Sequence, residues 1–187
     1  METIERDVIR LLLDLARSRY FGKYRGKVVD NVDATRKGRL KVHVPAVLGG
    51  LHVWAMPCVP YAGDGVGFLS IPAVDAGVWV EFEGGDPSFP IWVGCFWADG
   101  EAPEQANPDV KTWKSEQLVV RLDDANAELE IAADDGASIA ITTEAVTAAG
   151  DTKHTVSPSG VAGEAGAQKT ELTAASFSVN SGALEVI

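Results

Sequence analysis

Hydrophobic and polar residues alternate in three different ways along the 187-residue chain, and each way predicts a different element. Over residues 3–18 the apolar positions recur every three or four residues, at Ile4, Val8, Leu11, Leu12 and Leu15. This spacing places them on one side of an α-helix, with Thr3 as the candidate N-cap. The apolar stripe of a short terminal helix needs cover, either from its own domain or from a partner subunit.

Between residues 20 and 98 the pattern changes to short apolar runs separated by turn residues. The runs are 23–29, 39–44, 53–59, 66–71, 78–82 and 91–97. Aromatic and β-branched residues crowd the run 78–82, which is typical of a small closed barrel whose interior is filled by side chains. Five or six short strands in under 80 residues, with one long connection in the middle, indicate a five-stranded Greek-key barrel of OB type.

Large apolar side chains become sparse after residue 113, with 17 in the last 74 residues, about 23%. They still recur as pairs at alternating positions, with Asp, Asn, Ser, Thr and Gly between them. The pairs are Val120 and Leu122, Leu129 and Ile131, Ile139 and Ile141, Phe177 and Val179, then Leu184 and Val186. Their early spacing of about ten residues is that of one strand and one tight turn, and it predicts roughly seven stacked strands.

A narrow apolar face on so sparse a sheet cannot be buried within one chain of this length. The sequence therefore predicts an intertwined trimeric β-helix, or β-prism, in which alternating apolar side chains meet at the axis. The predicted axis residues are Val120, Leu122, Leu129, Ile131, Ile139, Ile141, Phe177 and Val179. The alternative interpretation is a loosely ordered acidic tail.

The predicted fold class is thus all-β with one short helix. Its parts are an N-terminal docking helix (1–19), the OB-type barrel (20–98), a Pro- and acid-containing linker (99–113) and the β-helical spike (114–187).

Charge is distributed unevenly along the chain. Residues 1–41 carry a net +5, residues 42–110 contain no Lys or Arg and carry −9, and residues 111–187 carry −7, for a total of −11. So acidic a protein is a poor candidate for coating the phosphate backbone of DNA or RNA, and no nucleic-acid partner is expected. The sequence shows neither a signal peptide nor the roughly 20 apolar residues of a membrane-spanning helix, so synthesis and assembly in the cytoplasm are expected.

Catalytic motifs are not evident in the sequence. It contains no G-x-S-x-G, H-E-x-x-H, Walker loop or dinucleotide fingerprint. The pairs Asp123-Asp124 and Asp134-Asp135 are expected to be solvated turn residues rather than paired catalytic carboxylates. Cys58 and Cys95 lie in apolar runs and are expected to fill the core. The chain is therefore predicted to be no enzyme and to hold no metal or cofactor, and its three histidines are scattered singly at His43, His52 and His154.

The basic run of residues 36–41 (RKGRLK) is the feature that favours nucleic acid, because OB barrels bind single strands through basic grooves and stacking aromatics. A solvated hairpin end or contact with an acidic protein is the favoured interpretation, since the rest of the barrel is anionic. The barrel tryptophans are expected in the core or at a subunit interface rather than on a stacking platform. They are Trp54, Trp79, Trp92 and Trp97.

Five blocks of sequence carry a resemblance to a known family. They are YRGKVVD (24–30), GRLKVHVP (38–45), WAMP (54–57), GVWVEFEGGDP (77–87) and PIWVG (90–94). In order and composition they resemble the OB-fold domain of the phage baseplate assembly protein V and VgrG family, the central spike of contractile tails, type VI secretion systems and related injection particles. The resemblance covers about residues 20–98, and it implies a homotrimer in which a β-helical spike follows the barrel.

The resemblance also implies a structural, non-enzymatic role for a component of a phage tail or injection particle, linking hub or tube to a membrane-piercing tip. About twenty residues precede the barrel, so the chain is similar to short spike subunits whose hub is another polypeptide. The residues expected to dock on that hub protein are Ile4, Val8, Leu11, Leu12 and Leu15.

The end of the spike departs from family members that carry an iron-binding H-x-H apex. The expected cap is instead a PAAR-like tip protein, contacted by Leu184, Val186 and Ile187, and the target-cell membrane is expected to be a transient partner.

Two other functions stay open on the sequence. One is an OB-fold binding module for a nucleic acid or oligosaccharide with a flexible acidic tail. The other is a polysaccharide-degrading tail enzyme, which the missing acid/base constellation disfavours.

Overall fold

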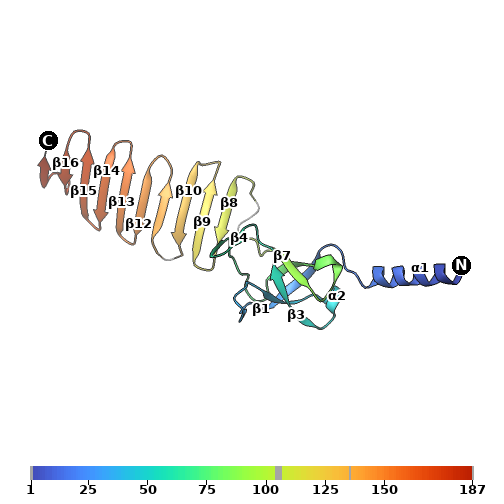
Figure 1. Cartoon of the computed structure of the whole chain (residues 1–187). Helices are drawn as coiled ribbons and strands as arrows, with labels where there is room; N and C mark the ends of the chain where they lie inside the picture. The colour runs from blue at the N-terminus through green and yellow to red at the C-terminus, as the bar shows by residue number, and fades with distance from the viewer. Residues whose placement is uncertain (1, 104–106, 135, 187) are drawn as a thin grey trace. The chain divides into compact units, whose positions relative to one another are not determined.

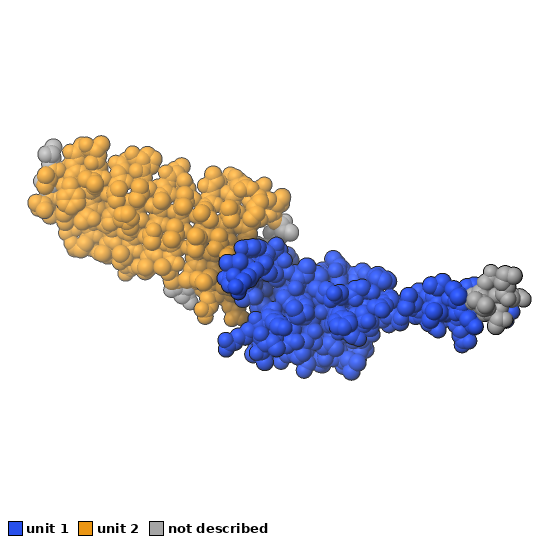
Figure 2. All heavy atoms as spheres, viewed as in Figure 1, with its two compact units in different colours: residues 1–101 blue, residues 102–187 orange. Residues whose placement is uncertain are grey.

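Two compact units make up the protein, residues 1–101 and residues 102–187, coloured separately in Figure 2. The structure is a computed structural model that describes residues 2–103, 107–134 and 136–186, with the side chains of residues 2–5 and 185 outside that description.

The first unit contains a helix followed by a closed five-stranded barrel (Figure 1). After α1 (Glu2–Arg17), the barrel strands are β1 (Tyr24–Asp30), β2 (Leu40–His43), β3 (His52–Pro57), β6 (Gly77–Phe82) and β7 (Pro90–Phe96). They close in the order β1-β2-β3-β7-β6, with β3 and β7 parallel and the other pairs antiparallel. The expectation of an OB-type barrel is confirmed.

The connections of the barrel differ from the expected pattern at two places. Helix α2 (Pro45–Leu48) follows β2, because the fixed φ of proline suits the first helical position. The run 66–71 was expected to be a strand, but only the short hairpin of β4 (Ala62–Gly63) and β5 (Val66–Gly67) forms there. Leu69, next to this hairpin, is exposed, so the apolar run is a surface connection. The helical turn η1 (Glu83–Gly85) joins β6 to the segment before β7.

The barrel interior holds the apolar core. Its buried residues are Val28, Leu40, Val42, Val44, Ala55, Val78, Val80, Phe82 and Trp92. Every second residue of β6 is buried, as expected for a strand with one face toward a core. Gly26 permits the close approach of neighbouring strands, because a Cβ there would lie 3.1 Å from the carbonyl oxygen of His43 and 3.3 Å from a methyl carbon of Val80.

The second unit, within its described residues, is one ten-stranded antiparallel sheet in which each strand pairs with its neighbours in sequence (Figure 1). The strands are β8 (Val110–Lys114), β9 (Leu118–Asp123), β10 (Glu128–Ala133), β11 (Ser138–Ile141), β12 (Ala145–Ala149), β13 (Thr152–Ser157), β14 (Gly160–Ala165), β15 (Gln168–Thr173), β16 (Phe177–Val179) and β17 (Leu184–Val186). The sheet begins at Val110, inside the stretch expected to be linker.

Ten strands form where roughly seven were expected. The strands β12–β15 are rich in Ala, Thr and Gly and carry few large apolar residues, so an alternation of large side chains does not reveal them. Regular backbone pairing nevertheless continues through them, for example over six residue pairs between β13 and β14.

The described residues of the second unit include no buried large hydrophobic side chain, because all of the buried apolar core lies in the barrel. Burial of apolar surface is the dominant favourable term in folding, and within the single chain this sheet gains little of it.

Shortening Leu40 to Ala should lower the free energy of unfolding of the barrel by about 2–5 kcal/mol, because the fully buried side chain leaves a cavity. Urea unfolding of the full chain, followed by tryptophan fluorescence, measures the loss. The matched control is Leu51→Ala, at an exposed position, which should change stability by less than about 0.5 kcal/mol. Equal losses in both variants would contradict the described core.

Candidate functional site

The sheet of the second unit has two chemically different faces. In an antiparallel sheet, directly opposed residues lie side by side on the same face. One such row is formed entirely of apolar residues, which are Leu122, Leu129, Ile141, Ala145, Val156, Val161, Leu172, Phe177 and Val186. This row runs without a break from β9 to β17.

A second row lies two residues away on the same face. It contains Trp113, Val120, Ile131, Ile139, Thr147, His154, Gly163, Thr170, Val179 and Leu184. We call the first the edge row, the second the central row, and the two together the apolar face. All eight residues predicted for a trimer axis lie on this face, as do Leu184 and Val186.

Sequence reasoning missed four members of the edge row, Ala145, Val156, Val161 and Leu172. Each of the last three is the single large apolar residue of its strand, so no alternating pair marks it. The signal that finds them is the pairing register, because it aligns them with Ile141 and Phe177 across the sheet.

Much of the apolar face is open to solvent in the single chain, although some of its members are half-buried. Ile139 and Ile141 have exposed fractions of 42% and 44%, and Leu172 reaches 53%. Contiguous apolar surface of this kind marks a protein interaction site rather than an ordinary solvated surface.

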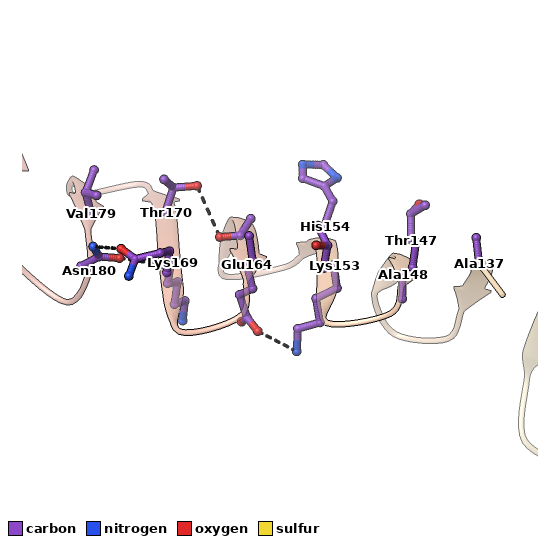
Figure 3. A pocket seen from close by; sticks show the side chains of 15 residues that line it. Ala137, Thr147, Ala148, Lys153, His154, Glu164, Lys169, Thr170, Val179 and Asn180 are labelled. Carbon is purple, nitrogen blue, oxygen red and sulfur yellow. Dashed lines mark hydrogen bonds and ion pairs between the residues drawn. The ribbon is translucent and has the colours of Figure 1, made fainter. Parts of the chain in front are cut away.

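The opposite face is polar and carries charge pairs. Lys153 Nζ lies 3.3 Å from a carboxylate oxygen of Glu164, directly across the β13–β14 ladder. Figure 3 shows Lys153 and Lys169 on one side of the strands and His154 and Thr170 on the other. Water can therefore solvate one face while the other remains available for packing.

Asp123, at the end of β9, is buried and not a solvated turn residue as expected. Its carboxylate accepts hydrogen bonds from the backbone and side-chain nitrogens of Asn126, each at 3.0 Å, and from Arg121 Nη2 at 3.0 Å. The hydrogen bonds from Asn126, followed by those of Arg121, lower the pKa of Asp123 against the effect of its burial. The neighbouring Asp124 pairs with Lys111, so this acidic pair holds a turn in place.

A hollow of about 550 Å³ lies over the middle of the sheet (Figure 3). On the apolar face its lining includes Thr147, His154, Gly163, Thr170 and Val179. These are consecutive members of the central row, at the place where large apolar residues give way to small and polar ones.

Helix α1 presents a second uncovered apolar surface. Val8, Leu11, Leu12 and Leu15 are all exposed, as is every described side chain from Arg6 to Arg17, while that of Ile4 lies outside the described residues. Packing of the stripe on its own domain is therefore not observed. The helix begins at Glu2, so Thr3 lies in its first turn rather than at the N-cap.

No helix in the described chain is long and apolar enough to cross a membrane.

Asp33 organises the basic hairpin of residues 36–41. Its carboxylate, 4% exposed, accepts hydrogen bonds from Arg39 Nη2 at 2.8 Å and Nε at 3.1 Å. It also accepts from the backbone N–H groups of Thr35 at 3.0 Å and Lys37 at 2.9 Å. The Arg39 guanidinium holds the pKa of Asp33 well below its usual range, opposed by partial burial and reinforced by the hydrogen bonds of Thr35 and Lys37. Lys37 and Arg39 of the basic run thus help to hold the loop in place.

The barrel tryptophans occupy different environments. Trp92 is buried in the core and donates a hydrogen bond from Nε1 to the carbonyl oxygen of Gly38 at 3.1 Å, as expected. Trp54 and Trp79 are half-buried and lie beside the guanidinium groups of Arg39 and Arg25. Trp97 is exposed and does not belong to the core.

The expectation that both cysteines fill the core is wrong, because Cys58 and Cys95 are exposed. Cys58 directly follows the end of β3 and Cys95 is the penultimate residue of β7, where strands leave the barrel and side chains regain contact with water. Within one chain, the described residues include no cluster of three or more His, Cys, Asp or Glu that could hold a metal ion.

Comparison with known families identifies the barrel. Residues 24–97 match the family described as the type VI secretion system/phage-baseplate injector OB domain, and this stretch begins with β1 and includes all of β7. The resemblance seen in the sequence blocks is confirmed for the barrel, which matches the injector OB domain family over these residues. The match supports a structural role in a baseplate, in contact with other baseplate or tail components. A search of curated proteins found no match.

Replacing Asp33 with Asn should lower the stability of the barrel at neutral pH. It should also reduce the further loss of stability that occurs as the pH falls. A carboxyl whose pKa is lowered by folding stabilises the folded state above its ordinary pKa of about 4, and this contribution is lost as pH falls below that value. Unfolding midpoints measured between about pH 7 and pH 2 test the effect.

The control is Asp64→Asn in the exposed turn between β4 and β5, which should keep the acid slope of the unmodified chain. Identical acid slopes for Asp33→Asn and the unmodified chain would show that the loop does not depend on this carboxylate.

Proposed function

We propose that this chain forms the homotrimeric central spike of a contractile injection particle, which joins a hub or tube to a membrane-piercing tip. The unbroken edge row of the apolar face carries the proposal. Nine apolar residues lie in register across the sheet, seven exposed and two (Leu129 and Val161) half-buried in the single chain, and such a row favours a partner surface of the same length and chemistry. A second and a third copy provide it.

Three sheets around one axis would bury the apolar faces and leave the polar faces in water. Since the strands pair within one chain, each wall of this prism would be one chain's sheet, and the natural right-handed twist of sheets would wrap the three walls around one another. Two sheets packed as a sandwich would bury the same face. Similarity to the injector family favours three.

The hydrogen bonds between strands give the prism its mechanical role. Ten strands about 4.8 Å apart extend roughly 45 Å from β8 to β17, and the backbone hydrogen bonds run along that direction. A load along the spike would therefore act along the hydrogen bonds of three walls at once, while side chains interlocked at the axis resist buckling.

Helix α1 would dock on the hub protein through the stripe of Ile4, Val8, Leu11, Leu12 and Leu15. The exposure of the four described members supports this, because no surface of the same chain covers them. Arg10 and Arg17 lie on other sides of the helix, away from this stripe.

The far end of the sheet would receive a PAAR-like tip protein. Leu184 and Val186 of β17 are exposed, and β17 pairs with β16 alone among the described strands, so one edge of its backbone is open for a cap. Ile187, the third expected contact, lies outside the described residues. The capped end would contact the target-cell membrane transiently.

An OB-fold binding module for an acidic ligand is the second candidate function. The register of β1–β3 places Lys27, His43 and His52 in one cross-strand line, with Lys41 opposite Trp54 nearby. The rings of His43 and His52 lie 5.1 Å apart. Cationic and aromatic groups on this side of an OB barrel suit a nucleic acid or an anionic oligosaccharide. A monomeric chain that binds such a ligand would favour this function over the spike.

The variant Ile139→Asp should abolish the trimer, because it would place three carboxylates together in an apolar interior at a cost of several kcal/mol each. Light scattering of the purified full-length chain measures the mass, which should be three times that of one chain before substitution and that of one chain afterwards.

The matched control is Ser138→Asp, the adjacent residue of β11, whose side chain lies on the polar face. It should leave the trimer intact. A monomeric or dimeric unmodified chain, or equal disruption by both variants, would refute the three-walled prism.

The variant Leu11→Asp should leave the trimer unchanged and weaken binding to the hub at least tenfold, since it puts a charge in the middle of the α1 stripe. Co-purification of the full chain with the hub subunit of the same particle measures binding. Arg10→Gln, on the adjacent polar side of the helix, is the control and should bind like the unmodified chain. Hub binding that survives Leu11→Asp would exclude the stripe as the docking surface.

A further inference from the structure

His154 is the one titratable side chain in the edge and central rows of the apolar face from β9 to β17, all of which lie within the described residues. It lies in the central row of β13, opposite Thr147 on one side and Gly163 on the other. A histidine in the middle of a face that is otherwise built for burial needs a partner when that face is covered.

The neighbours of His154 create a polar section within the central row. Thr147, Gly163 and Thr170 surround it, whereas Ile131 and Ile139 lie toward β9 and Val179 and Leu184 toward β17. Figure 3 shows His154, Thr147 and Thr170 projecting to the same side of the strands. This section coincides with the hollow of about 550 Å³, so the sheet is both polar and recessed here.

Gly163 keeps the space beside the imidazole free. A Cβ at this position would lie 3.0 Å from Thr170 Oγ1, on the face that His154 shares. A side chain at position 163 in β14 would therefore occupy part of the hollow beside His154. The small residues next to His154 leave space there for a ligand.

We propose that three copies of His154 bind one divalent transition-metal ion of the zinc class on the axis of the trimer. The site is incomplete in one chain, which supplies a single imidazole, so this inference rests on the proposed homotrimer. Two sheets packed face to face lie about 10 Å apart. Each wall of the prism would therefore lie about half that distance from the axis, which is roughly the length of one side chain. Because the central row projects from the middle of each wall, three-fold symmetry brings the three imidazoles to one level.

The chemistry of the recess suits this ion. Neutral imidazole nitrogen is a common ligand of Zn²⁺ and related ions, and three histidines with one water complete a tetrahedral shell at Zn–N distances of about 2.0–2.1 Å. The hydroxyls of Thr147 and Thr170 lie within the same polar section and can accept or donate hydrogen bonds to such a water. The apolar residues above and below exclude bulk water from the bound ion.

The other two histidines do not provide this arrangement. His43 and His52 lie beside each other on the barrel, and His43 Nε2 is 2.9 Å from the carbonyl oxygen of Gly49. They belong to β2 and β3 rather than to the face that meets the axis. His52→Ala is therefore a matched control for loss of a histidine without loss of the axial site.

The test uses the full-length chain, freed of metal with a chelator and then incubated with excess Zn²⁺ before gel filtration. Elemental analysis should find one zinc per three chains, and Co²⁺ in place of Zn²⁺ should give the intense visible absorption of tetrahedral coordination. His154→Ala should lose this metal, whereas His52→Ala should retain it. Zinc should raise the melting temperature of the unmodified chain and leave that of His154→Ala unchanged.

Light scattering on the same samples separates failure of this inference from failure of the spike. A trimer that retains no zinc, or retains it equally in His154→Ala, overturns the metal site and leaves the spike standing. A monomer without zinc overturns both. If His154→Ala does not form the trimer, His154→Gln keeps a polar side chain of similar size, and loss of zinc from a trimeric His154→Gln supports the site.

Discussion

The stability of the second unit depends on covering the apolar face of its ten-stranded sheet. Apolar residues occupy every position of the edge row, yet no large hydrophobic side chain of the described part of this unit is buried in the single chain. Burial of apolar surface is the dominant favourable term in folding, and here it is available only on association. If the proposed trimer forms, folding of the sheet and assembly of the trimer are therefore expected to be one process.

The barrel differs from the sheet because it buries an apolar core of its own. Leu40, Val42 and Val80 are fully enclosed, and Asp33 fixes the hairpin that precedes β2. In the proposed spike, one chain would combine a domain that holds its own core with a sheet that becomes stable by packing against other copies. Such a division would suit a structural component that is attached at one end and rigid along the other.

Much of the fold follows from patterns of large side chains. Alternation in β1, β2, β6 and β7 predicts the barrel, and the paired residues of β9–β11 predict the apolar face of the sheet. Where large side chains are few, the pattern fails. The strands β12–β15 are held by backbone pairing that Ala, Thr and Gly neither encourage nor prevent, so the number of strands was underestimated.

Residues whose surroundings depend on the folded arrangement of their neighbours, near or far in sequence, were also beyond sequence reasoning. Asp123 looks like a solvated turn residue until Arg121 and Asn126 enclose it, and Cys95 looks like core until β7 is seen to end beside it. The place of His154 depends on the register of three strands, and no local pattern gives that register. For the same reason Val156, Val161 and Leu172 are recognised as one row only after pairing is known.

The nearest-neighbour order of the strands makes the length of the sheet adjustable. Each strand contacts only the strands before and after it, as in repeat proteins whose units are added in one dimension. Inserting or deleting a hairpin of two strands would preserve the direction of the chain and the inward face of every other strand. In the proposed spike, the length of the sheet could therefore change in steps of about 10 Å, the width of two strands, without any change in the barrel.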